Sequence, residues 1–357
     1  MKIKILFFMP NLEGGGAERV LINIMRQLDK NIFDIYLVLV DKSGDYLELV
    51  PNEVNIIDLN TKNISKSFFK LRSVLKEIEP NILFSSLFTT NIMLYLSSLF
   101  LLKNSKIVLR SPNSPKLVLE NNQMSLLMKF LLERAYNKAD YILAQTPEMK
   151  YEINKYHNIN DDKIITFLNP LDTEFIDNKT LNISNPFDTH YINVVASGRL
   201  HKQKGFDTLI KSFKYVIEKN DKFRLYIIGK DKGEEDYLRT LIKNLKLGNF
   251  VKLLGFQDNP YRFYFYSDLF VLSSRWEGLP NAVLENLYLN KPIVATKCIP
   301  FMNTLIDDGK NGFLVEIDNE TELANKILKY KSLSPDKGYK GEDINKLFQK
   351  INKGNLK

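Results

Sequence analysis

The residues of this sequence best suited to chemistry are two glutamates, Glu277 and Glu285, with seven residues between them. They lie in a segment that follows the short apolar run 269–272, which predicts a buried parallel strand. The segment then passes through a Gly-Leu-Pro turn into a helix expected over 281–290. Such a start of a helix favours a bound anion, because backbone amides and the positive end of the helix dipole face it. The pattern predicts a phosphate-bearing ligand.

The two carboxylates are not suited to face that phosphate, since like charges repel. Carboxylates accept charge-assisted hydrogen bonds from sugar and ribose hydroxyls, which makes these hydroxyls good candidate partners. Each glutamate alone also fits a structural role, with Glu277 bordering the helix and Glu285 solvated on it. A glycosidase also uses two carboxylates, but a hydrolase has no use for a phosphate site.

A second loop supplies positive charge. The apolar run 192–196 predicts a strand, and the loop 197–205 after it contains Arg199 and Lys204. A planar guanidinium and a mobile ammonium together suit a diphosphate leaving group. Lys202, in the same loop, also fits a solvated basic turn.

A glycine-rich turn follows the first expected strand, 3–9. Glycines in the run 14–16 would let a ligand approach the backbone closely at the start of the next helix. The dinucleotide fingerprint G-x-G-x-x-G is not matched, although Asp41 could imitate the ribose-binding acid of such folds. An oxidoreductase is therefore an alternative that the turn alone leaves open.

The elements that must position these residues alternate between strand and helix in both halves of the chain. This alternation predicts an α/β fold with doubly wound parallel sheets, and 357 residues suggest two domains. We expect an N-terminal domain over 1–178, a polar linker over 179–190, a C-terminal domain over 191–330, and a closing helix and tail over 331–357.

Composition limits the cellular setting. The single cysteine, Cys298, excludes an intramolecular disulfide and fits a reducing compartment. No secretory signal is found, and the longest apolar run, 92–102, is too short to span a bilayer. The net charge of +8 fits a pyrophosphate ligand or an anionic membrane surface, and no nucleic-acid motif accompanies it. We therefore expect a cytoplasmic protein that does not bind nucleic acid.

Together these segments resemble the family 4 retaining glycosyltransferases, which have the GT-B fold. The stretch 274–285 is similar to the family's E-x7-E signature, 14–18 to its G-G-A-E motif, 198–205 to its basic donor loop and 255–260 to its nucleobase loop. The resemblance spans about residues 3–330. It implies two Rossmann-like domains that face each other across a cleft, an acceptor-side domain followed by a nucleotide-sugar-binding domain.

The resemblance also implies residue roles. Glu277 would bind the hydroxyls of the donor sugar, while Arg199 and Lys204 would neutralise the leaving diphosphate, and these three form the predicted catalytic set. The predicted donor-binding set is Gly15, Gly16, Gly255, Phe256, Asn259, Gly278, Leu279, Pro280, Asn281 and Glu285. The acceptor-side candidates are Glu18, Arg110 and Asn113. Asn113 stands where many family members have a histidine, and the histidines of this chain lie elsewhere.

The implied function is retaining transfer of a hexose or N-acetylhexosamine from a nucleotide diphosphate donor, with a UDP-sugar favoured, to a lipid-linked saccharide. The G-G-A-E variant favours assembly of envelope polysaccharide, such as O-antigen, capsule or a glycan precursor. No acidic D-x-D cluster is found at a strand end, so we expect no metal and no other cofactor. A GT-B sugar-nucleotide epimerase and a non-catalytic scaffold of a membrane glycosylation complex are the alternatives.

Two segments are candidates for contact with an anionic membrane. Residues 62–76 contain lysines and an arginine, no acidic residue, and interleaved apolar side chains such as Phe69. Residues 124–134, with Lys129 and Arg134, form the second segment. The commoner structure for such a pattern is a surface helix whose apolar stripe packs into the core. Membrane contact would place the protein at the inner face of the cytoplasmic membrane.

Overall fold

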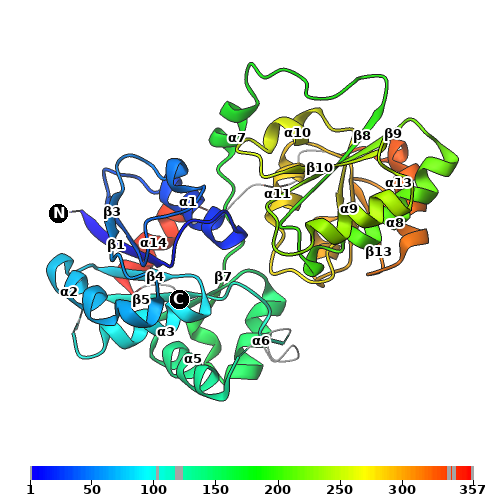
Figure 1. Cartoon of the computed structure of the whole chain (residues 1–357). Helices are drawn as coiled ribbons and strands as arrows, with labels where there is room; N and C mark the ends of the chain where they lie inside the picture. Colours follow the sequence, from blue (N-terminus) through cyan, green and yellow to red (C-terminus); the bar gives the residue numbers. More distant parts are fainter. Residues whose placement is uncertain (1, 102–103, 117–123, 336–338, 340–342, 355–357) are drawn as a thin grey trace. The chain divides into compact units, whose positions relative to one another are not determined.

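The computed structural model describes residues 2–101, 104–116, 124–335, 339 and 343–354. The chain forms two compact units (Figure 1). The N-terminal unit contains residues 1–172 and 341–357, and the C-terminal unit contains residues 173–340. Both units are α/β structures built around a parallel sheet.

The N-terminal unit has a seven-stranded sheet in the order β3-β2-β1-β4-β5-β6-β7. Its strands are β1 (Ile3–Met9), β2 (Phe33–Leu39), β3 (Asn55–Asp58), β4 (Ile82–Ser85), β5 (Lys106–Arg110), β6 (Tyr141–Ala144) and β7 (Ile164–Thr166). Its helices are α1 (Gly16–Gln27), α2 (Phe68–Ile78), α3 (Phe88–Ser98), α5 (Leu126–Lys138), α6 (Pro147–His157) and α14 (Ile344–Lys353). The order reverses between β1 and β4, as in a doubly wound sheet.

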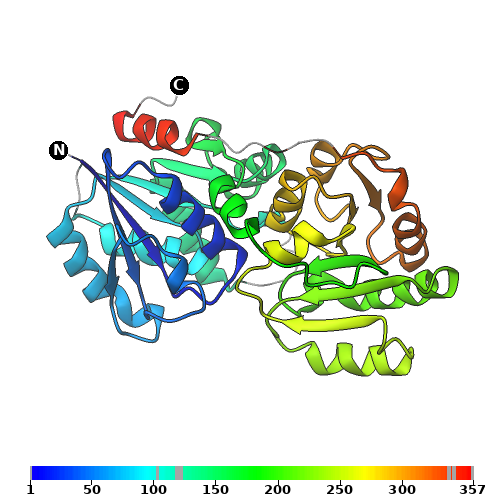
Figure 2. The same ribbon diagram turned by 90° about the horizontal axis from the view of Figure 1, so that it is seen from above.

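Side chains of β1 alternate between two helical layers, because successive residues of a strand point to opposite faces. Leu6 and Phe8 belong to a buried cluster with residues of α2, α3, α5 and α6. Phe7 faces the other way and contacts Phe348 of α14, with ring centroids 6.3 Å apart. Figure 2 shows α14, coloured red, beside the N-terminal unit although it is the last helix of the chain. Helices therefore cover both faces of this sheet.

The C-terminal unit has a six-stranded parallel sheet in the order β10-β9-β8-β11-β12-β13. Its strands are β8 (Ile192–Ser197), β9 (Phe223–Ile228), β10 (Val251–Gly255), β11 (Leu269–Leu272), β12 (Ile293–Thr296) and β13 (Gly312–Val315). Its helices are α7 (Thr173–Thr180), α8 (Phe206–Lys219), α9 (Glu235–Asn244), α10 (Tyr261–Tyr266), α11 (Asn281–Tyr288), α12 (Met302–Leu305) and α13 (Glu320–Leu328).

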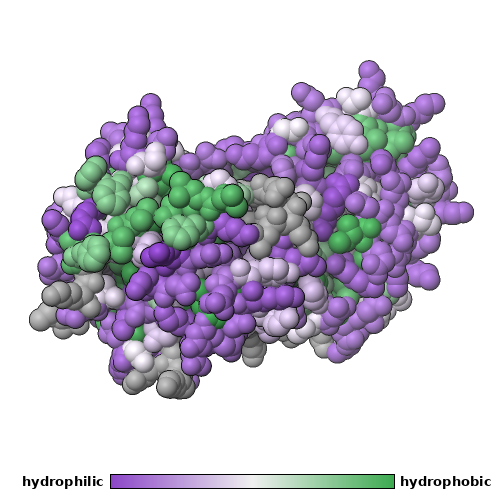
Figure 3. Space-filling model, turned by 90° about the horizontal axis from the view of Figure 1, so that it is seen from below, coloured by the Kyte–Doolittle hydropathy of each residue, from purple (hydrophilic) through white to green (hydrophobic). Residues whose placement is uncertain are grey.

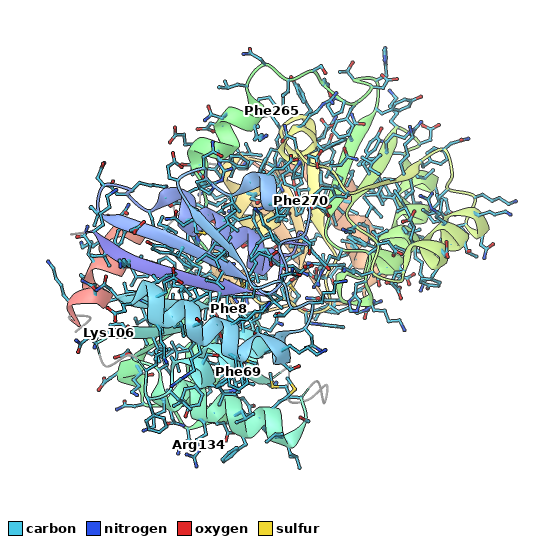
Figure 4. The ribbon with its side chains drawn as sticks, turned by 60° about the vertical axis from the view of Figure 1, so that its left-hand side comes forward. Phe8, Phe69, Lys106, Arg134, Phe265 and Phe270 are labelled. Carbon is cyan, nitrogen blue, oxygen red and sulfur yellow. The ribbon has the colours of Figure 1, made fainter. Side chains whose placement is uncertain are left out.

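The strands of this second sheet also bury both faces. Leu269 and Val271 of β11 pack in a cluster with α8, α9 and α13, whereas Phe270 points to α10, where its ring contacts Tyr264 at 5.6 Å. The expected fold class, two doubly wound α/β domains, is thus confirmed. Figure 4 labels Phe8 and Phe270, which lie in the two sheets.

The compact units divide between Asp172 and Thr173, ahead of the expected boundary at residue 178. The reason is that α7 packs on the C-terminal unit. The Asn259 side chain donates a hydrogen bond to the carbonyl of Lys179, and the Tyr288 hydroxyl donates one to Asp177, both at 2.8 Å. The helix expected within 331–357 is α14, and its contacts place it in the N-terminal unit.

The apolar stripe of α2 packs into the core, as in the commoner of the two structures expected for residues 62–76. Leu71, Leu75 and Ile78 are buried in the cluster that covers the N-terminal sheet. Phe69, at the start of α2, is instead 81% exposed. Most of the apolar face of α2 is therefore taken up by the core, and Phe69 is the large apolar side chain that it leaves exposed among the described residues.

Candidate active site

The start of α11 has the features of an anion site. Pro280 occupies its N-cap position and makes no side-chain capping hydrogen bond, and the first turn contains no acidic residue. Of the α-helices that the structure describes, four others are capped by a side-chain oxygen: α5 by Ser125, α6 by Thr146, α13 by Asn319 and α14 by Asp343. The predicted residues Gly278, Leu279 and Pro280 are buried at this end of α11. The dipole of α11 is therefore not offset by a capping carboxylate.

Glu277 is buried just before that helix and is held in place through one of its oxygens. Its Oε1 accepts hydrogen bonds from Lys204 Nζ at 2.5 Å and from Ser274 Oγ at 2.6 Å. Its Oε2 accepts a longer one, 3.4 Å, from Gln203 Nε2. Burial, together with the charge of Glu277, raises the pKa of the nearby Cys298 thiol to about 12. The site thus holds one carboxylate in a defined orientation, with Oε2 able to accept further hydrogen bonds.

The two loops that carry these residues are joined by backbone contacts. Ser273 Oγ donates to the carbonyl of Lys204 at 2.8 Å, and the amide of Arg275 donates to the carbonyl of Gln203 at 2.7 Å. Gly205 adopts φ +59°, and a Cβ there would lie 2.2 Å from the Ser273 carbonyl oxygen. Only glycine allows the two loops to approach this closely without strain.

The two predicted cations differ in their surroundings. The stem of Lys204 crosses Gly198, where a Cβ would lie 2.8 Å from Lys204 Cε. Its ammonium is committed to Glu277, a contact that sequence analysis did not predict. Arg199 is exposed and has no hydrogen bond or ion pair with any residue that the structure describes. Arg199 can therefore turn to a ligand without breaking an existing pair.

Arg275, which was not predicted from the sequence, connects neighbouring segments two residues before Glu277. Its Nη2 pairs with Asp207 at 2.8 Å, its Nε pairs with Asp318 at 2.9 Å, and its Nη1 donates to the Lys202 carbonyl. Hydrogen bonds to Asp207 and then Asp318 raise its pKa further above its usual range, so it is always charged. A shallow pocket beside it is lined by Lys202, Asp207, Glu234, Tyr237, Arg275 and Trp276.

Glu285 is also buried, inside α11, and is 6% exposed. Tyr261 of α10 donates its hydroxyl to Glu285 Oε1 at 3.1 Å. The Tyr261 ring packs edge-on against Tyr264, with centroids 6.0 Å apart. The alternative in which Glu285 is a solvated helix residue is therefore wrong. The contact of Tyr261 with this carboxylate was not predicted from the sequence.

The predicted nucleobase loop follows β10. Gly255 adopts φ +67°, and a Cβ there would meet no atom within 4 Å, so backbone conformation rather than crowding requires glycine. Phe256 is half-buried. Asn259 donates to the carbonyl of Lys179, and its buried Oδ1 has no hydrogen-bond partner among the described residues. The Asn259 amide thus serves to attach α7.

In the N-terminal unit, the glycine-rich turn leads directly into α1. Gly15 is the N-cap residue and Gly16 the first helical residue. A Cβ at Gly15 would lie 2.4 Å from Glu18 Oε2, so the carboxylate of Glu18 lies over the start of the helix. A negative charge at that place disfavours a phosphate there, and sugar hydroxyls suit it better.

The other two acceptor-side candidates have opposite exposure. Arg110, at the end of β5, is 3% exposed and donates to Ser86 Oγ at 2.9 Å and to Asn169 Oδ1 at 2.6 Å. Burial lowers the pKa of Arg110 to about 9. Asn113 is exposed in the loop that follows. Arg110 therefore connects three loops at this sheet edge, and Asn113 is the residue accessible to a ligand.

Within the C-terminal unit the structure brings Glu277 and Lys204 into contact, and Glu285 and Asn281 lie on the helix that follows. Gly15, Gly16, Glu18, Arg110 and Asn113 belong to the other unit. Among the described residues, no group of three or more His, Cys, Asp or Glu side chains is arranged to hold a metal ion. No helix within the described ranges is long and apolar enough to cross a membrane.

Comparison with known proteins gives two family matches and several relatives. Residues 14–175 match the model of Glycosyltransferase Family 4, and residues 177–341 match that of Glycosyl transferases group 1. An uncharacterized glycosyltransferase of Methanocaldococcus jannaschii is 34% identical over 250 residues, which are 66% of this chain and 60% of that protein.

A second relative covers more of the chain. The N-acetylgalactosamine-N,N'-diacetylbacillosaminyl-diphospho-undecaprenol 4-alpha-N-acetylgalactosaminyltransferase of Campylobacter jejuni is 28% identical over 329 residues, 90% of this chain and 88% of its own length. The crystal structure of Anabaena HepE in complex with UDP and glucose superposes with a TM-score of 0.74 at 19% identity, covering 99% of this chain and 97% of that one. The fold is therefore GT-B, and the chain belongs to the glycosyltransferases that join a family 4 domain to a group 1 domain.

Proposed function

We propose that this glycosyltransferase moves a hexose or N-acetylhexosamine from a nucleoside diphosphate donor, a UDP-sugar, to a lipid-linked saccharide with retention of anomeric configuration. The observation that carries the proposal is the buried Glu277, paired with Lys204 just before a helix whose N-cap residue, Pro280, offers no capping side-chain oxygen. The Campylobacter relative is named for transfer to a diphospho-undecaprenol-linked saccharide, which supports an acceptor of this class in envelope glycan assembly.

The leaving diphosphate requires positive charge that is already in place when the sugar bond breaks. The dipole of α11 supplies part of it. Arg199 is exposed and lacks a partner among the described residues, so its guanidinium is available for bidentate contact with phosphate oxygens. Lys204 keeps two further ammonium protons beyond its bond to Glu277. These groups would make a metal unnecessary.

The two carboxylates bind hydroxyl groups in this proposal. Glu277 accepts from the donor sugar through Oε2, because its Oε1 is occupied by Lys204 and Ser274. Glu285, oriented by Tyr261, accepts from the ribose. The acceptor hydroxyl attacks from the face that the diphosphate leaves, which retains the configuration of the sugar. The proposal assigns no residue as a carboxylate nucleophile on the opposite face of the sugar.

A thermal-shift screen tests the donor assignment, since a ligand that binds the native state raises the midpoint of unfolding. We expect UDP to stabilise the protein more than GDP, ADP, CMP or NAD. Stabilisation by NAD alone would reject the transferase, and interconversion of a sugar nucleotide without acceptor would instead identify an epimerase.

A transfer assay with a lipid-linked acceptor tests the reaction itself. We expect the new linkage to keep the anomeric configuration of the donor sugar. The coupling constant of the anomeric proton measures this configuration. The rate should be unchanged in EDTA. Loss of activity in EDTA that Mg²⁺ or Mn²⁺ restores would reject metal independence.

A further inference from the structure

We propose that one face of the N-terminal unit binds an anionic lipid bilayer. The face, called here the apolar surface, consists of Phe69, Phe100, Leu126, Leu127 and Phe130. It is built by the start of α2, the turn after α3 and the outer side of α5. The inference rests on the proposed function in one respect, because a lipid-linked acceptor is met at a membrane.

The residues of the apolar surface are large and hydrophobic, yet each is more than half exposed. Phe100 is 101% exposed, Leu126 87%, Phe69 81%, Leu127 67% and Phe130 51%. The other exposed large hydrophobic residues that the structure describes are one residue of α6 and residues scattered over the C-terminal unit. Figure 3 shows a continuous hydrophobic area over the N-terminal unit on the face seen from below. A contiguous patch of exposed hydrophobic side chains marks a binding surface, whereas single exposed hydrophobic residues are normal on a protein surface.

Contacts within the unit bring the three segments together. Arg72, one helical turn after Phe69, donates hydrogen bonds to the carbonyls of Ser97 and Leu99 at the end of α3. Phe100 is the next residue of the chain. Leu99 and residues of α5, among them Met128, pack on the same core cluster, and α3 contacts α5. The apolar surface is thus supported from beneath by the folded core.

The backbone at Phe100 is a second indication of an external partner. This residue adopts φ +57°, a conformation that is costly for a bulky side chain and is more often occupied by glycine or asparagine. An aromatic residue in such a turn is usually held by packing, yet the ring of Phe100 contacts solvent on all sides. The turn therefore presents the ring outward.

Positive charge surrounds the apolar side chains and decides between possible partners. Lys66 and Lys70 are exposed beside Phe69 in a segment without acidic residues, and Arg134 lies over the Phe130 ring at 5.0 Å. Figure 4 labels Phe69 and Arg134 on the same side of the N-terminal unit. Apolar side chains within a cationic border match the interface of an anionic bilayer. A second copy would bring like charges together.

Vesicle co-sedimentation of the full chain, without donor or acceptor, tests the inference. We expect binding to vesicles of phosphatidylcholine with phosphatidylglycerol, and weaker binding to phosphatidylcholine alone or at about 0.5 M salt. The triple variant Phe100→Ser, Leu127→Ser, Phe130→Ser should partition at least about tenfold more weakly. The variant Lys66→Glu, Arg134→Glu should lose the preference for anionic vesicles. Tyr215→Ser, an exposed aromatic of α8, is the matched control and should bind normally.

Equal thermal midpoints of the variants and the wild type would exclude unfolding as the cause. Unchanged sedimentation of the triple variant would overturn the inference. So would a wild-type dimer that the triple variant dissociates while neither protein binds vesicles, since the surface would then be an interface between copies. Vesicle binding without any sugar transfer would reject the proposed function and keep the apolar surface. Sugar transfer to a water-soluble acceptor by a protein that does not bind vesicles would keep the transferase activity and overturn the inference about the apolar surface.

Discussion

At the scale of single residues, the pair formed by Lys204 and Glu277 determines what the site can do. A buried carboxylate next to a helix start is stable only when a cation and hydroxyl donors compensate its charge. Lys204 and Ser274 provide this compensation, and both act on the same oxygen. The second oxygen of Glu277 is the one left for a ligand.

Replacing either predicted cation should reduce turnover. We expect Lys204→Ala and Arg199→Ala each to lower kcat about a hundredfold, because each removes a charge that stabilises the leaving diphosphate. Lys204→Ala should also raise the KM for the donor, since Glu277 loses its orientation. Steady-state rates with saturating acceptor measure both effects. Lys202→Ala, in the same loop but with a solvent-exposed side chain, should react normally. Normal turnover of Arg199→Ala would remove that residue from the site.

His157 gives a prediction about pH that concerns stability. Burial, with a smaller effect of Lys129, lowers the pKa of His157 to about 4. Between pH 6.5 and 4 the unfolded chain binds a proton that the folded chain does not, so this residue lowers stability as the pH falls. The loss should reach about 3 kcal/mol near pH 4. Urea unfolding of wild type and His157→Phe measures it, since other groups titrate alike in both. Equal slopes between pH 7 and 4.5 would contradict the prediction.

At the scale of elements, the site depends on two loops from neighbouring strands, β8 and β11, held in contact by Gly205. Strand order places these two ends side by side. Backbone hydrogen bonds between the loops then set the position of Lys204 relative to Glu277. The loops therefore behave as one piece, and damage to either should affect both.

Gly205→Ala tests this dependence. A Cβ would lie 2.2 Å from the backbone oxygen of Ser273, so we expect a loss of about 1–3 kcal/mol in unfolding free energy and a fall in donor affinity. Gly233→Ala is the matched control, since Gly233 has φ +95° but no atom within 4 Å of a new Cβ. It should show the conformational cost alone, with normal donor binding measured by titration calorimetry. Equal donor affinity in the two variants would reject the steric explanation.

The elements were largely predictable from the sequence, and the contacts between them were not. Strands such as 3–9 and 269–272 are local apolar runs whose burial on both faces requires a parallel sheet. The glutamate spacing and the basic loop selected Glu277, Glu285 and Lys204 as candidates, and the structure places Lys204 in contact with Glu277. The partners of these residues could not be identified, because Ser274 and Tyr261 carry no local signal and Lys204 is far from Glu277 in sequence. The exposure of Phe100 is likewise a property of the folded turn.

At the scale of the whole molecule, the last helix belongs to the first unit. Asn345 of α14 accepts from the amide of Asp29 at 2.7 Å and donates to the carbonyl of Gln27 at 2.9 Å, at the end of α1. Phe348 is fully buried against Phe7 and Phe84. The N-terminal unit is therefore completed only when the end of the chain returns to it.

Phe348→Ala tests this assembly. Removing a fully buried ring should destabilise by about 3–5 kcal/mol, and the loss should appear in the unfolding of the N-terminal unit. Hydrogen exchange read separately for residues 2–101 and 192–330 would locate it. Lys350→Ala, exposed on the same helix, should have no comparable effect. Faster exchange confined to the C-terminal unit would contradict the assignment of α14.

The return of α14 also has a consequence for how such enzymes diversify. Residues 173–340 form a continuous insert whose two ends both join the same neighbour. An insert of this kind can be exchanged by recombination at two points without dividing the hydrophobic core of either partner. Under the proposed assignment of the donor site to this insert, donor choice and acceptor choice change independently within one lineage. Chimeras joined at these two points with a relative of different donor preference would carry the insert's donor and the host's acceptor.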